Sequence, residues 1–158
     1  MKGFFLTLIF IPLFWYGCES KINAPEVGNA DLRVNYSQKL YDDIAAGKVS
    51  DTLSTDLFTI KEVSIMDTTL LIKVSYSGGC NDHTFDLVWP EIITQQYPPD
   101  ITVYLYHDSN GDSCEALLTK TLAYDFSDCP LGLSKEAIQL MRITVVNGSN
   151  PENTVSNK

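Results

Sequence analysis

The sequence predicts a mainly β protein, an antiparallel β-sandwich or open barrel of about six strands with one short N-terminal helix. From residue 70 to 76, the apolar residues Leu70, Ile72, Val74 and Tyr76 alternate with Leu71, Lys73 and Ser75, directly after the tight-turn sequence MDTT, and this is the signature of a β-hairpin. The segment 101–107, ITVYLYH, is rich in β-branched and aromatic residues, which favour strands. Turn sequences separate such segments at short intervals, a spacing typical of sandwiches and barrels.

The expected elements follow from the period of the apolar residues. In residues 35–46, Tyr36, Leu40 and Ile44 fall near one helical face and Gly47 follows as a C-cap, so we expect a short helix there. After a connection rich in Ser, Thr and Asp, the apolar period changes to two. The expected strands cover residues 58–65, 70–76, 83–89, 101–107, 115–126 and 140–146.

The segments between and after these strands are predicted from their turn residues. Pro90 ends the third strand, because proline cannot donate to a central ladder. Residues 108–112, DSNGD, predict a turn, although their alternating oxygen ligands are also similar to the start of a calcium loop that lacks its closing acid. We expect a loop or one-turn helix at residues 134–137 and a frayed polar tail over residues 147–158.

Residues 1–17 are predicted to be a signal peptide. Their apolar core, residues 4–15, is shorter than the roughly 20 residues that span a membrane. It ends at Gly17-Cys18, which resembles the junction of bacterial lipoprotein signals, with a relaxed lipobox because aromatic residues precede Gly17. The resemblance implies that Cys18 becomes the first mature residue and carries the lipid. Ordinary secretion, with Cys18 free or disulfide-bonded, is the alternative.

The mature chain is expected to form one domain. Residues 18–30 supply the lipid-attachment cysteine and a tether, residues 31–148 a single β-rich domain, and residues 149–158 a flexible tail. The net charge of −9 and the lack of a basic cluster argue against nucleic acid and anionic lipid surfaces as partners. We therefore expect an exported protein, held to the cell envelope by its lipid and facing the periplasm or the cell surface.

The residues best suited to form a disulfide, bind a metal or take part in a reaction are Cys80, His83, His107 and Cys114. They lie near the ends of the expected strands. In an oxidising compartment paired thiols usually form disulfides, so we expect a Cys80–Cys114 bond. Closing the loop of about 35 residues between these two cysteines would stabilise the fold by about 4 kcal/mol in the chain-entropy model. The alternative is a tetrahedral zinc site that uses all four residues, since thiolate and imidazole suit zinc.

Two further possibilities concern the same residues. Cys80 could act as a nucleophile with a histidine as base, but no known nucleophile signature surrounds it, and a disulfide would abolish that chemistry. Cys129 has no intramolecular partner if Cys18 is lipidated and the other two cysteines pair. The sequence assigns no catalytic residue and no cofactor.

Aromatic residues at strand spacing could line a ligand cleft, although such residues are more often core residues or cross-strand pairs. The candidates are Phe85, Trp89, Tyr97, Tyr104, Tyr106, Tyr124 and Phe126.

The stretch YSGGCNDHTFDLVW and the later run YHDSNGDSCEALLTKTLAYDF resemble an uncharacterised group of exported bacterial lipoproteins. The shared features are Gly78-Gly79-Cys80, His83, Phe85 and the run Cys114-Glu115-Ala116, within about residues 60–130. The resemblance implies that Cys80 and Cys114 belong to one feature and implies no activity. We therefore expect a non-catalytic binding, interaction or envelope-structural module whose partner, a protein or a small ligand, is not specified. The alternative is a zinc-type metal-binding domain.

Overall fold

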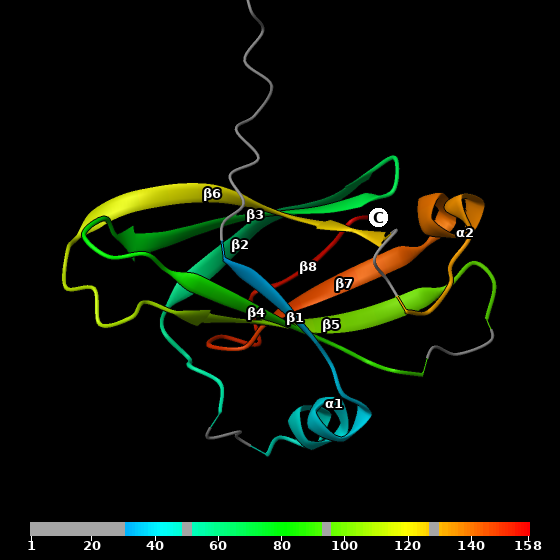
Figure 1. Ribbon diagram of the computed structural model, residues 1–158, viewed down its shortest axis with the longest axis horizontal. Helices are drawn as coiled ribbons and strands as arrows, with labels where there is room; N and C mark the ends of the chain where they lie inside the picture. The colour runs from blue at the N-terminus through cyan, green and yellow to red at the C-terminus, as the bar shows by residue number, and fades with distance from the viewer. Residues whose placement is uncertain (1–30, 49–51, 93–95, 127–129) are drawn as a thin grey trace, which may run out of the picture.

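The computed structural model describes residues 31–48, 52–92, 96–126 and 130–158, and these form two packed β-sheets and two short helices (Figure 1). The five-stranded sheet contains, in spatial order, β1 (Leu32–Tyr36), β4 (Thr84–Trp89), β5 (Asp100–Asp108), β7 (Arg142–Asn147) and β8 (Thr154–Ser156). The three-stranded sheet contains β2 (Phe58–Met66), β3 (Thr69–Gly78) and β6 (Ala116–Asp125). The helices are α1 (Gln38–Ala45) and α2 (Lys135–Leu140). The predicted mainly β sandwich is confirmed.

The three-stranded sheet is fully antiparallel, as expected. β2 and β3 form a hairpin whose turn includes Asp67 in the left-handed region at φ 58°. This conformation is one that Asp tolerates better than most residues do. β3 then pairs with β6 along its whole length, from Thr69 opposite Asp125 to Gly78 opposite Ala116.

The five-stranded sheet is mixed, so the expectation of a purely antiparallel fold is wrong here. β1 runs parallel to β4, and β5 runs parallel to β7. Parallel neighbours need long crossover connections, and here the chain between β1 and β4 contains the hairpin of the other sheet. Local periodicity carries no information about such pairing, so the sequence could not reveal it.

The core lies between the sheets, where the inward-facing residues of every long strand meet. Its largest fully buried side chains include Trp89 and Phe85 of β4. β4 is also buried on its other face: Val88 is inaccessible and Asp86 nearly so, because α1 packs over the outside of this sheet (Figure 1).

Helix α1 is shorter than expected because β1 occupies the start of the predicted helix. Ser37 ends the strand and caps the helix, its Oγ accepting the N–H of Leu40 at 3.3 Å. The helix ends before Gly47, which adopts a left-handed conformation at φ 73°. The C-cap is Ala46 rather than the predicted Gly47, which lies one residue further on as the left-handed glycine that follows a helix end, and the predicted N-terminus is wrong.

The C-terminal residues are part of the domain, so the predicted frayed tail and the boundary at residue 148 are wrong. β8 pairs antiparallel with β7. Asparagine side chains then replace backbone partners: Asn153 Oδ1 accepts the N–H of Ile60 at 2.7 Å, and Asn157 Oδ1 accepts that of Ile143 at 2.9 Å. A polar composition suggested a loose segment, but its amides bond to neighbouring strands.

The predicted signal peptide and tether, residues 1–30, lie outside the described residues. Within the residues that are described, no helix is long and apolar enough to cross a membrane.

Candidate functional site

The predicted disulfide is present. Cys80, in the loop after β3, is bonded to Cys114, in the loop before β6, with a Cα–Cα separation of 5.9 Å. Because β3 and β6 pair along their length, the two loops emerge side by side at one end of the sandwich. Cys18 and Cys129 lie outside the described residues.

A buried carboxylate holds these two loops together. Asp112 Oδ2 accepts the backbone N–H groups of Gly79, Cys80 and Asn81 at 2.8, 2.8 and 2.9 Å, and Oδ1 accepts that of Cys114 at 2.8 Å. The side chain of Asp112 is inaccessible to solvent. Backbone hydrogen bonds, led by those from Asn81 and Cys114, hold the pKa of this carboxyl well below its usual range. The sequence indicated only a turn residue here, since the bonding depends on a loop about 30 residues away.

The two histidines continue inward from this carboxylate. His83 Nε2 lies 3.1 Å from Asp112 Oδ2, and His83 Nδ1 lies 2.8 Å from His107 Nε2. The ionised carboxylate can only accept, so His83 carries its proton on Nε2 and its Nδ1 accepts from His107. The order of donation is therefore from His107 to His83 to Asp112.

The inner end of this chain has no polar partner among the described residues. His107 is 2% exposed, and its Nδ1 makes no hydrogen bond. Its ring stacks on Phe85, with centroids 4.6 Å apart, and meets Phe58 edge-on at 5.7 Å. Burial, and secondarily the neighbouring His83, lowers the pKa of His107. His107 is therefore held neutral.

The position of the His83 ring requires a glycine at residue 78, the first of the Gly78-Gly79 pair. A Cβ atom at this position would lie 2.4 Å from His83 Nε2 and 2.5 Å from its Cε1. The ring of His83 has little room to move, because it packs against Tyr76 with a centroid distance of 4.7 Å and stacks on His107 at 5.0 Å. Only glycine fits between β3 and the imidazole.

The zinc hypothesis does not match this arrangement. The described part of the chain holds one group of three ligand-type residues with ligand atoms within 4.8 Å of one another, namely Cys80, Asp112 and Cys114. The two sulfur atoms of that group are bonded together, and both oxygens of Asp112 accept backbone N–H groups. Both nitrogens of His83 are likewise used. A zinc site would need the disulfide reduced and these bonds rearranged.

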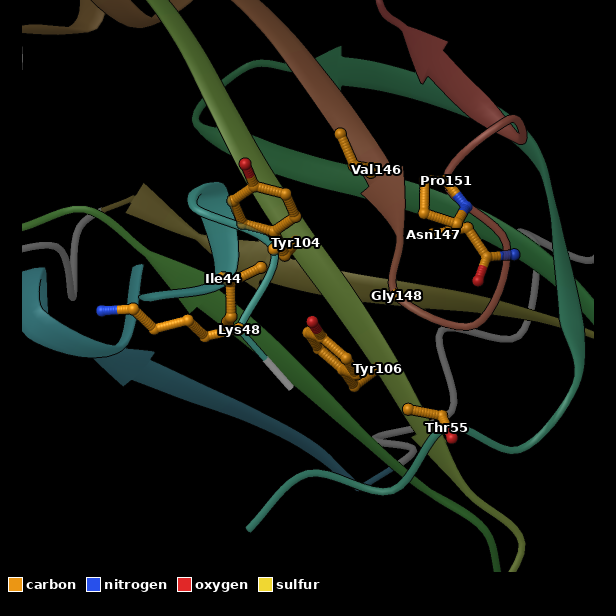
Figure 2. A pocket seen from close by; sticks show the side chains of 10 residues that line it. Ile44, Lys48, Thr55, Tyr104, Tyr106, Val146, Asn147, Gly148 and Pro151 are labelled. Carbon is orange, nitrogen blue, oxygen red and sulfur yellow. The ribbon is translucent and has the colours of Figure 1, made fainter. Parts of the chain in front are cut away.

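A second site lies on the outer face of the five-stranded sheet, where a pocket of about 250 Å³ opens (Figure 2). It lies between the end of α1, the outer face of β5 and the turn after β7. Its lining residues are Ile44, Gly47, Lys48, Thr55, Tyr104, Tyr106, Val146, Asn147, Gly148 and Pro151.

Two tyrosines of β5 form the base of this pocket. Tyr104 and Tyr106 alternate with the buried residues Val103 and Leu105, so both rings stand on the outer face (Figure 2). A Cβ atom at Gly148 would lie 2.4 Å from the ring of Tyr106, so the ring lies directly against the glycine backbone. Burial raises the pKa of both phenols above the usual range, which keeps their hydroxyl groups protonated at neutral pH.

The pocket is close to electrically neutral. Among the described residues that line it, Lys48 is the one with a charge, and the Lys48 ammonium lies 2.8 Å from the carboxylate of Asp43. Figure 2 shows this side chain directed away from the two tyrosines, with its methylene groups beside Ile44. The pocket therefore presents apolar surface and phenol groups rather than a charge.

A more polar depression of about 270 Å³ lies on the same outer face, around Arg33 and Asp86. Arg33 contacts both carboxylate oxygens of Asp86, at 2.7 and 3.0 Å, and Asn35 donates to the same group at 3.1 Å. These polar groups bond to one another, so the cluster anchors β1 to β4 and leaves little unsatisfied polarity for a ligand.

Of the aromatic residues predicted to line a cleft, only Tyr104 and Tyr106 line this pocket. The structure places Phe85, Trp89, Tyr124 and Phe126 in the core and leaves Tyr97 exposed. The alternation within β5 was visible in the sequence. Which of its two faces would be left open depended on where α1 packs.

Comparisons with known proteins found similarity only among solved structures, since no family model and no curated protein matches the chain. A protein of unknown function, DUF1344, from Bacteroides vulgatus aligns at 14% identity and a TM-score of 0.48, over 80% of this chain and 55% of that one. A putative toxin related protein from Parabacteroides distasonis aligns at 16% and 0.48, over 80% and 58%.

A NigD-like immunity protein from Bacteroides caccae aligns at 17% identity and a TM-score of 0.43, over 75% of this chain and 51% of that one. The chain thus spans a little over half the length of the structures it resembles. Likenesses at this level say nothing about what the chain binds.

Proposed function

We propose that the chain is an exported, lipid-anchored binding module whose ligand or partner occupies the tyrosine-lined pocket on the outer face of the five-stranded sheet. The observation that carries the proposal is the pocket itself. Tyr104 and Tyr106 stand open on a strand whose alternate residues are buried, and apolar side chains from α1 and the turn after β7 enclose them. Open concave surfaces with apolar walls and a few polar groups are the usual form of small binding sites.

The disulfide-linked loops and the histidine pair serve as a scaffold in this proposal. The two cysteines are joined to each other, and the carboxylate and both nitrogens of His83 are hydrogen-bonded. A general base or nucleophile needs a free atom directed at a substrate. These residues instead bind one another and tie β3 to β6, so we assign them a stabilising role and no reaction.

Export and lipid attachment complete the proposal. The Gly17-Cys18 junction after an apolar segment supports a lipoprotein signal, and a disulfide suits an oxidising compartment. The test is labelling of producing cells with a clickable palmitate analogue. We expect label on the wild-type protein and none on Cys18→Ser; equal label on both would contradict lipidation at this residue.

The binding role is tested by an NMR screen of the labelled chain against a library of small fragments of mixed chemistry. We expect saturable shifts that centre on Tyr104, Tyr106 and Val146. Ile44→Trp, which fills the pocket from the end of α1, should abolish them. Leu117→Trp is the matched control, because Leu117 is 79% exposed on the other sheet. Binding that Ile44→Trp leaves unchanged would show that the pocket is not the site.

A further inference from the structure

The size of the outer-face pocket limits what it can hold. Pockets for whole drug-sized molecules usually enclose roughly 300–1,000 Å³. The pocket here encloses about 250 Å³ and is open to solvent on one side. It therefore suits one ring-sized group that projects from a larger body, and it is too small for a nucleotide or an extended cofactor.

The walls favour an aromatic ring. Ile44, Val146 and Pro151 offer aliphatic surface, while Tyr104 and Tyr106 offer ring faces and edges (Figure 2). Tyr104 already packs against Tyr41 with a centroid distance of 5.3 Å and an interplanar angle of 57°. Another ring placed against these tyrosines would gain the offset or edge-to-face contacts that aromatic pairs prefer.

Electrostatics narrow the choice further. The ammonium of Lys48 is ion-paired with Asp43 at 2.8 Å, so a carboxylate beside it balances its positive charge. The chain as a whole carries a net charge of −9, which repels anions at longer range. A partner that approaches this face should therefore be neutral or basic around the ring, which gives it charge complementarity to the module.

We infer that the pocket receives an aromatic side chain of a partner polypeptide, presented from a segment that is neutral or basic. The inference rests on the proposed function and names the partner class for the same site. A polypeptide is favoured because the pocket takes one side chain and opens onto the outer face of β5 and β7, whose outward residues, such as Thr102 and Thr144, are partly exposed and can be contacted by flanking residues. Buried aromatic residues are the groups that most often dominate such interfaces.

The first experiment uses NMR titration of the full chain with probes that differ in charge but share one ring. The probes are N-acetyl-tryptophanamide, which is neutral, tryptamine, which is cationic, and N-acetyl-tryptophan, which is anionic; methyl β-glucoside is the non-aromatic probe. We expect the amide and tryptamine to bind with a Kd on the order of 1 mM. N-acetyl-tryptophan should bind at least about threefold more weakly, and the glucoside should give no saturable shift.

Ile44→Trp should weaken the amide at least tenfold, whereas Leu117→Trp should leave its Kd unchanged. If the glucoside or the anionic probe binds best and Ile44→Trp abolishes that binding, the proposed function stands and the aromatic-side-chain inference fails. If none of the four probes shifts the pocket residues, the aromatic-side-chain inference fails, and the fragment screen decides separately whether the pocket binds any ligand.

The second experiment tests whether the ring belongs to a polypeptide. Random peptides displayed on phage are selected against the wild-type chain and counter-selected against Ile44→Trp. We expect enrichment of peptides with one aromatic residue and neutral or basic neighbours. Enrichment of acidic peptides, or no enrichment over the variant, would overturn the assignment of a polypeptide partner.

Discussion

Mild acid should destabilise this protein through the buried pair of histidines. In the folded state His107 donates to His83 and His83 donates to Asp112, and within the described part of the protein every polar atom of these three side chains has a partner except Nδ1 of His107. An additional proton must end on that atom. It would leave His107 with an N–H that has no polar partner among the described residues, beside the rings of Phe58, Phe85 and Tyr76.

The sign of the effect follows from the lowered pKa of His107. Burial, followed by the neighbouring His83, disfavours its charged form in the folded state, while the unfolded chain binds a proton below about pH 6.5. The unfolded state thus takes up more protons as the pH falls, so the free energy of unfolding decreases from pH 6.5 toward the folded-state pKa. For one proton the slope is at most about 1.4 kcal/mol per pH unit, or at most about 2 kcal/mol between pH 6.5 and 5.

Other groups near the pair titrate in a different range. The pKa values of Asp112 and Asp56 are lowered, by backbone N–H donors and by Ser109 respectively. Their contribution to stability is therefore present above the unfolded carboxyl pKa of about 4 and is lost only below it. Carboxylates cannot produce a loss of stability between pH 6.5 and 5, so this window isolates the histidines.

The assay is urea unfolding at a series of pH values from 8 to 4.5, followed by the fluorescence of the buried Trp89. His107→Phe is the diagnostic variant, because phenylalanine keeps the ring stack on Phe85 and removes the titrating group. We expect the slope between pH 6.5 and 5 to flatten in this variant, whatever its stability at pH 8. A wild-type stability that is constant over this window, or an unchanged slope in His107→Phe, would refute the reasoning.

Three further predictions concern the same end of the sandwich. Gly78→Ala should lower the free energy of unfolding by about 1–3 kcal/mol in urea unfolding, because its Cβ would overlap the His83 ring. Ser77→Ala, on the exposed face of the strand, is the control and should change the free energy of unfolding by less than about 0.5 kcal/mol. Replacing Cys80 and Cys114 together by alanine should cost about 4 kcal/mol, since their bond closes a loop with a separation of 34 residues, and a loss below about 1 kcal/mol would show that the clamp by Asp112 suffices. A zinc site remains a prediction for the reduced chain only. On the oxidised protein, competition with a chromogenic chelator should detect no stoichiometric zinc. Stoichiometric zinc that His83→Ala removes would contradict this.

Much of the fold could be predicted from local pattern. The alternation of residues 70–76 and 101–107 and the turn before Thr69 determine strands and a hairpin, because side-chain period and turn chemistry are local properties. The predicted export signal favoured a disulfide through compartment chemistry, and the position of Cys80 and Cys114 near the ends of expected strands favoured that pair. The sequence also showed that Tyr104 and Tyr106 would share one face of their strand.

Tertiary structure decided the rest. The parallel pairing of β1 with β4, the place of β8 in the sheet and the covering of Asp86 and Val88 by α1 all depend on segments that are distant along the chain. The role of Asp112 as a clamp arises only when the β3–β6 pairing brings its loop to the N–H groups of residues 79–81. The pocket likewise exists only because α1 and the turn after β7, which are distant along the chain, meet around Tyr104 and Tyr106. The reason is that neighbouring residues determine the apolar period of a strand and the conformation of a turn, whereas burial and hydrogen-bond partners depend on which surfaces of the protein meet.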